Sequence, residues 1–221
     1  MTLPPKITEL HEREVAQLVA AQQPHIDAVL ASTNKTVEWF IDIIVRDVTH
    51  LATTVAGFLT YISFHAQHLA VEEVALKIKT AGAQIESTTA ALKTQVMGLL
   101  AADIGSYASF MFTDDSAHPI IIHSGKDIIE TAHTMLGELY ESITGMGSYL
   151  ESLGDITGNV ADIKFDGQRI AYMFQSLAAQ IVQHVIVIDH TKERIDETVK
   201  NSNAAVDRIL KSYSAKIAAR T

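Results

Sequence analysis

The stretch that decides the fold is Ile170–Ile188, IAYMFQSLAAQIVQHVIVI, which has nineteen residues and no formal charge. It opens a longer segment, Gln168 to Arg220, that contains neither glycine nor proline. Because proline and glycine are the residues that most disfavour a helix interior, their absence allows one uninterrupted helix. Starting seven residues after Ile188, mostly apolar residues recur in helical steps of four and three, at Ile195, Val199, Ser202, Val206, Ile209 and Tyr213. We therefore predict a helix over about residues 168–220.

A second long helix is predicted upstream. The chain has four prolines, and the gap between Pro24 and Pro119 is wide enough for a long helix. We expect a short helix over about residues 6–22, then a helix that starts at Asn34 as N-cap and runs to about residue 100. Small or apolar residues follow one seven-residue frame in this region, at Ile43, Phe64, Val71, Ile78, Ile85, Leu92 and Leu99.

Between the long helices lies a hydrophobic segment, Tyr107 to Ile122, with the sequence YASFMFTDDSAHPIII. Its FMF and III runs flank an acidic turn and a proline, which predicts a small β-hairpin or a helix–loop–helix tip. We therefore expect an all-α, elongated antiparallel bundle that forms one domain, 1–221. It would have two very long helices, about 34–100 and 168–220, and a hydrophobic tip at about 100–135. The candidate membrane-contact residues of the tip are Tyr107, Phe110, Met111, Phe112, Ile120, Ile121 and Ile122.

Two further stretches are nearly free of charge. Val48–Val71 has none, and Thr94–Thr113 has only Asp103. A membrane helix needs about 20 predominantly apolar residues, but His, Gln, Thr and Ser are scattered through all these stretches. Two interpretations remain open: core helices of a soluble bundle, or helices that leave the bundle to contact a bilayer. In Ile170–Ile188 we expect one uncharged polar face, with Gln180, Gln183 and His184, opposite an apolar face with Phe174, Leu177, Ile181 and Ile188.

The composition excludes several classes of function. The net charge of the 221 residues is −9, which gives no general attraction for nucleic acid. Cysteine is absent, so disulfides, thiolate metal sites and thiol catalysis are excluded. The N-terminal sequence lacks the apolar core of a signal peptide, so we expect a protein that is cytoplasmic at synthesis, then membrane-associated or exported by a non-classical route. No catalytic or phosphate-binding motif is complete, and we predict a non-enzyme without a cofactor.

The histidines raise a metal alternative. Glu130 and His133 have the Glu-x-x-His spacing of carboxylate di-metal bundles, and Asp47 and His50 repeat it with Asp in place of Glu. Such spacing arises easily by chance, so we treat these four residues as candidate ligands only. A separate hypothesis is that His50, His65 and His68, which lie in or beside an uncharged stretch, respond to acid.

Long antiparallel helices around a hydrophobic tip, without cysteine or enzyme motif, resemble the α-helical pore-forming toxins of the cytolysin A type and their multi-component relatives. The resemblance is one of organisation, and no individual residue is carried over. It implies a membrane-active protein whose tip is shielded in the soluble form and that oligomerises on a bilayer, with lipid or partner helical proteins as its partners and homo- or hetero-oligomers as its assemblies. The alternatives are a soluble scaffold that binds partner helices, and the di-metal bundle.

Overall fold

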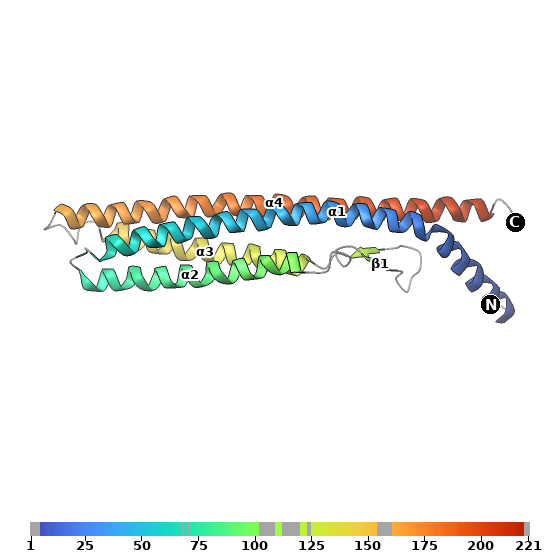
Figure 1. The fold of residues 1–221 in the computed structure, drawn as a ribbon, viewed down its shortest axis with the longest axis horizontal. Helices are drawn as coiled ribbons and strands as arrows, with labels where there is room; N and C mark the ends of the chain where they lie inside the picture. Colours follow the sequence, from blue (N-terminus) through green and yellow to red (C-terminus); the bar gives the residue numbers. More distant parts are fainter. Residues whose placement is uncertain are drawn as a thin grey trace. The chain divides into compact units, whose positions relative to one another are not determined.

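The computed structural model describes residues 5–67, 69, 71–101, 109–111, 120–122, 125–153 and 161–218. Its helices confirm the all-α class, with one short pair of strands beside them (Figure 1). The elements are α1 (Pro5–Ala66), α2 (Glu72–Ala101), β1 (Ser109–Met111), β2 (Ile120–Ile122), α3 (Lys126–Ser152) and α4 (Ala161–Ala218).

The chain divides into two compact units, each of which is described by itself. Unit 1 comprises residues 1–39, 103–124 and 194–221, and unit 2 comprises residues 40–102 and 125–193. Unit 2 thus takes the C-terminal part of α1, all of α2 and α3, and the N-terminal part of α4. Figure 1 shows these four helical segments side by side.

Unit 2 is an antiparallel four-helix bundle in which helices that are consecutive in sequence pack together. α2 packs along α3. α1 approaches α2 closely at Gly82, where an added Cβ would lie 3.4 Å from Cδ2 of Leu59. α3 approaches α4 at Gly147, where an added Cβ would lie 3.4 Å from Cβ of Phe174. At both positions, an added methyl group would be in ordinary van der Waals contact with the neighbouring helix, so the two helices are closely packed there.

Each helix of unit 2 buries residues in alternating steps of three and four, which is the pattern of coiled-coil packing. In α4 this buried seam runs through Ile170, Phe174, Leu177, Ile181, His184 and Ile188. In α1 it runs through Ile41, Ile44, Val48, Leu51, Val55, Phe58 and Ile62. The core of unit 2 is therefore specified by heptad-like sequence in all its helices, and not by helix propensity alone.

Unit 1 contains the N-terminal part of α1, the C-terminal part of α4 and the two strands. Ile26 and Val206 are fully buried against each other and are surrounded by partly buried apolar residues of both helices. The hydroxyls of Thr33 and Ser202 are hydrogen-bonded across the same pair. The strands are antiparallel, with Phe110 opposite Ile121, so the hairpin alternative for this segment is confirmed.

The predicted helix boundaries in the N-terminal half are wrong in two places. The first is the expected gap between residues 22 and 34, because α1 continues through Pro24 and Asn34. Pro24 is solvent-exposed, and the buried positions on either side of it, Gln22 and Ile26, keep the helical spacing. Burial of this seam outweighs the local cost of proline, and Asn34 is an interior residue of the helix and not its N-cap.

The second error is the continuous helix over 34–100. α1 ends at Ala66 and α2 begins at Glu72. The seven-residue frame that supported one helix is buried only in α2, whereas Phe64 and Val71 are 61% and 39% exposed. The seven-residue frame therefore marks core positions in α2 but not in α1 or in the turn between the two helices. Glu72 and Glu73 stand in the first turn of α2, where the helix dipole favours acidic side chains.

The C-terminal half agrees more closely with the prediction. α4 spans Ala161–Ala218, so it starts seven residues earlier than predicted and covers the predicted segment up to residue 218, beyond which the residues lie outside the described ones. α3 runs to Ser152 and includes Gly137, Gly145 and Gly147, so part of the glycine-rich segment is helical.

Candidate membrane-contact face

In unit 2, α1 and α4 lie antiparallel with their uncharged stretches next to each other. Phe58 meets Phe174 edge to face, with ring centres 4.9 Å apart. The guanidinium of Arg169 lies 5.2 Å from the ring centre of Tyr61, and the rings of His50 and His184 lie 6.1 Å apart. The chain thus places residues 48–61 of α1 alongside residues 170–183 of α4, and neither segment contains a charged residue.

The α2 and α3 side of the bundle is different. α2 carries six charged residues and α3 carries another six. One of them, Lys77, lies with its Nζ 4.5 Å from the ring centre of Tyr149, whose side chain raises the pKa of Lys77 above its ordinary value. Over the paired segments 48–61 and 170–183, α1 and α4 carry no charge, whereas both helices are charged beyond these segments, as at Asp47, Arg169 and Asp189.

Large apolar side chains are exposed on α1 and α4 in and beside these uncharged segments. Tyr172 is 70% exposed and Phe64 is 61% exposed. Tyr172, Ala179 and Ile186 follow one another at seven-residue intervals along the outer surface of α4, and all are exposed. We name this surface the uncharged face and define it by its exposed members, His50, Thr53, Gly57 and Phe64 of α1 with Tyr172, Ser176, Ala179, Val182, Gln183 and Ile186 of α4.

The threonines on and beside the uncharged face donate their hydroxyl protons to their own helix. Thr53 Oγ1 lies 3.0 Å from the carbonyl oxygen of Thr49, and Thr60 Oγ1 lies 2.9 Å from that of Ala56. Thr49 bonds back to Val45 in the same way, at 2.7 Å. A hydroxyl that is already paired loses less on leaving water than a free one, so these threonines lower the cost of transferring this surface to a less polar environment.

His184 does not lie on the polar face to which the sequence pattern assigned it, and that assignment is wrong. Its side chain is 9% exposed and belongs to the buried seam between Ile181 and Ile188. Its Nδ1 lies 2.8 Å from Oδ2 of Asp47, which accepts the hydrogen bond. Asp47 explains why a histidine can occupy this buried position, because a polar ring in an apolar seam is stable only when it is hydrogen-bonded. Gln180 and Gln183 are exposed, as expected.

The tip candidates lie in unit 1. Phe110 and Met111 belong to β1, and Ile120, Ile121 and Ile122 belong to β2, so the strand register brings these five candidates into one hairpin. Tyr107 and Phe112 lie outside the described residues, as do Asp114, Asp115 and Pro119.

The metal candidates are each paired with α4 and not with one another. His133 Nε2 lies 3.1 Å from Oδ1 of Asp189, and Glu130 Oε1 lies 3.2 Å from Nζ of Lys192. Asp47 bonds to His184, whose ring also neighbours His50. Within the part of the chain that the structure describes, no three acidic or histidine side chains gather around a point where a metal could sit. His65 packs against Tyr61 and Phe64, and His68 lies outside the described residues.

By length and composition alone, one stretch of the described helices, Gly167–Ser212, is apolar enough to cross a membrane. The core helix of a soluble bundle passes the same criterion. Comparison with protein-family models, curated proteins and solved structures finds no match for this chain. The features on which a function can be proposed are therefore the all-α fold, the uncharged face and the apolar hairpin.

Proposed function

We propose that this chain is a non-enzymatic, membrane-active helical protein that binds a bilayer through the uncharged face and perforates it through the hairpin. The observation that carries the proposal is the adjacency of two uncharged helical stretches, one from α1 and one from α4, on one side of unit 2. An interfacial helix surface binds lipid in proportion to the apolar area that it buries. Charged side chains would oppose this, and residues 48–64 and 170–188 have none; Arg169 lies over Tyr61 at the edge of the face.

The character of the face favours zwitterionic over anionic lipid. The protein has a net charge of −9, which repels an anionic surface, and the uncharged face contains no lysine or arginine, with Arg169 only at its edge. We expect binding that depends on apolar contact and is therefore insensitive to salt.

The hairpin supports the second half of the proposal. β1 and β2 pair Met111 with Ile120 and Phe110 with Ile121, so every register pair except that of Ser109 is apolar on both strands. The likeness to the α-helical pore-forming toxins, in which a hydrophobic segment inserts during assembly, favours the same role for this hairpin.

The experiment is vesicle flotation combined with dye release, with the purified chain and zwitterionic vesicles. The proposal predicts that the protein floats with the vesicles and releases the entrapped dye, to the same extent at low and high salt. Absence of flotation across lipid compositions would overturn membrane binding. Flotation without dye release would support membrane binding but would overturn the proposal that the protein perforates the bilayer.

A further inference from the structure

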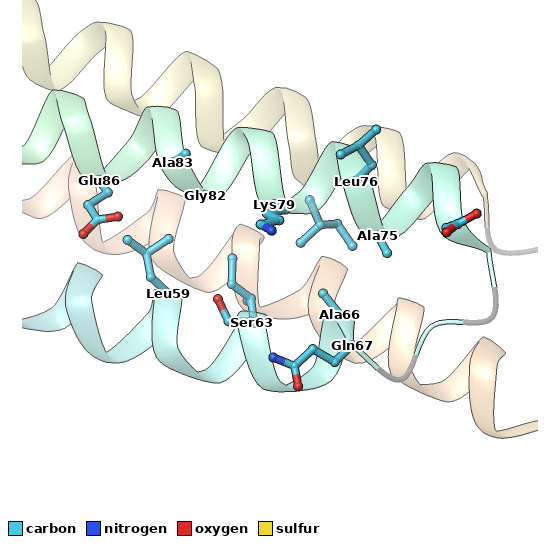
Figure 2. Close-up of a pocket in the computed structure, with 13 residues that line it drawn as sticks. Leu59, Ser63, Ala66, Gln67, Ala75, Leu76, Lys79, Gly82, Ala83 and Glu86 are labelled. Carbon is cyan, nitrogen blue, oxygen red and sulfur yellow. The ribbon is translucent and has the colours of Figure 1, made fainter.

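A groove runs between α1 and α2 on a different surface of unit 2. Its two sections have volumes of about 500 and about 450 Å³ and share Leu59, Ser63 and Glu86 in their walls. The α1 wall consists of small or uncharged residues from Ala52 to Gln67. Figure 2 shows Leu59, Ser63 and Gln67 on the α1 side, with Lys79 and Glu86 on the α2 side.

The α2 wall carries charges in a regular order. Glu72, Lys79, Glu86 and Lys93 stand seven residues apart and alternate in sign, and all four line the groove. Residues seven apart occupy the same side of a helix. All four are exposed, and none of them forms an ion pair with another residue in the described part of the chain. The α1 wall has no charge that could neutralise them.

This order of charges is complementary to itself when one α2 lies antiparallel to a second α2. Lys79 and Glu86 are equally far from the midpoint between Gly82 and Ala83, and so are Glu72 and Lys93. Antiparallel pairing about that midpoint therefore sets Lys79 opposite Glu86 of the second copy, and Glu72 opposite its Lys93. Ala75 and Ala90 are related in the same way.

Two other arrangements bring like charges together. Parallel pairing in register sets each of the four residues opposite itself, and an antiparallel shift by one heptad sets lysine opposite lysine and glutamate opposite glutamate. Like-charge contacts of this kind select against wrong registers. A parallel stagger of one heptad opposes unlike charges, but it has no two-fold symmetry and leaves a charge unpaired at each end. At the centre, Ala83 is small and exposed, which allows the second α2 to approach, whereas Gly82 is buried against Leu59 of α1.

From this geometry we propose that the α1/α2 groove is a homodimer interface, in which α2 of a second copy lies antiparallel along α2 with Lys79 paired to Glu86. The interface has two-fold symmetry, so that each ion pair occurs twice. Each α2 occupies the groove of the other copy, and the uncharged residues of α1 close its side. The proposal goes beyond membrane activity and does not depend on it, because the uncharged face on α1 and α4 is a separate surface.

Charge exchange tests the interface in the full chain without lipid. Lys79→Glu sets glutamate against Glu86 at both symmetric contacts, and Glu86→Lys sets lysine against Lys79. Each variant is expected to weaken the dimer by roughly tenfold or more in sedimentation measurements at low salt. Lys200→Glu makes the same change in net charge on an exposed residue outside the groove, and it should dimerise like the wild type.

A mixture of the two charge-exchange variants tests the antiparallel register directly. An equimolar mixture of Lys79→Glu and Glu86→Lys chains restores opposite charges at both contacts, so it should form a heterodimer while each variant alone remains monomeric. The double variant Lys79→Glu/Glu86→Lys should dimerise with itself. Circular dichroism establishes that every variant is folded. A wild-type chain that is monomeric throughout the micromolar range would overturn the interface, as would a dimer that both single variants leave unchanged. Failure of the mixture to associate would overturn the antiparallel register.

Discussion

His184 and Asp47 form a hydrogen-bonded pair that joins α4 to α1 inside unit 2, with 2.8 Å between Nδ1 and Oδ2. The two residues are separated by 137 positions in the sequence. The histidine occupies a core position between two fully buried isoleucines. This polar contact specifies the relative register of the two helices, because a shift of one turn would leave a buried ring and a carboxylate without partners.

Removing the carboxylate of Asp47 should therefore lower the free energy of unfolding more than removing an exposed carboxylate does. Asp47→Ala leaves the buried ring unpaired and should lower the free energy of unfolding by about 1–3 kcal/mol. The double variant Asp47→Ala/His184→Leu removes both polar groups and should recover most of that loss. Denaturant unfolding gives these values. Asp42→Ala, which breaks only the exposed ion pair with Arg46, is the matched control and should change stability by less than about 0.5 kcal/mol. A double variant no more stable than Asp47→Ala would contradict this account.

The contact between α3 and α4 at Gly147 gives a second prediction. Phe174→Ala removes a fully buried ring that packs on Phe58 and should cost about 3–5 kcal/mol. Gly145→Ala, two residues from Gly147, has nothing within 4 Å of its added methyl group and should stabilise the helix by about 0.5–1 kcal/mol. Gly147→Ala should gain at least as much, because its methyl group would be buried in van der Waals contact with Cβ of Phe174 at 3.4 Å. Thermal unfolding of the three variants checks this order, and a loss of stability at Gly147 would show that the contact between α3 and α4 has no room for a methyl group.

The sequence predicts a helix well where apolar periodicity and helix-breaking residues agree with the fold, and poorly where they do not. α4 was predictable because its apolar residues keep helical spacing over a segment without glycine or proline. The turn between α1 and α2 was not, because HAQHLAV contains no residue that breaks a helix. The only local signal there is the acidic pair Glu72–Glu73, which favours a helix N-terminus. Pro24 led to the opposite error. It predicted a helix end that the structure does not have, since burial of Gln22 and Ile26 on either side of it keeps α1 continuous.

The candidate site was predictable in part. The lack of charge in both stretches is visible in the sequence, but their adjacency is a property of the fold. His184 was assigned to a polar face because of its residue type, although its spacing from Leu177, Ile181 and Ile188 is that of a core position. Spacing was the better guide there. The partner Asp47 lies too far away in sequence for any local pattern to reveal it.

The uncharged face yields a third prediction. Tyr172→Glu and Ile186→Glu each place a charge on an exposed position of α4, so each should leave the free energy of unfolding within about 0.5 kcal/mol of the wild type. Each should also weaken vesicle binding about tenfold or more, since an apolar side chain no longer enters the lipid. Tyr140→Glu is the control, because Tyr140 is 38% exposed on α3 and lies outside the face. Flotation at several lipid concentrations measures the difference. Equal binding by the Tyr172 and Tyr140 variants would exclude the face as the contact surface.

The hairpin yields the last prediction, which separates binding from perforation. Ile121→Asp introduces a carboxylate opposite Phe110 in the strand register. If the uncharged face binds lipid and the hairpin inserts, this variant should float with vesicles like the wild type but release at least about tenfold less dye, because a carboxylate is costly in hydrocarbon. Lys200→Gln makes the same change in net charge outside the hairpin and should release dye normally. Undiminished release by Ile121→Asp would mean that another segment perforates the membrane, with α4 as the next candidate because Gly167–Ser212 is long and apolar enough to cross it. Loss of flotation together with release would instead make the hairpin the element that binds.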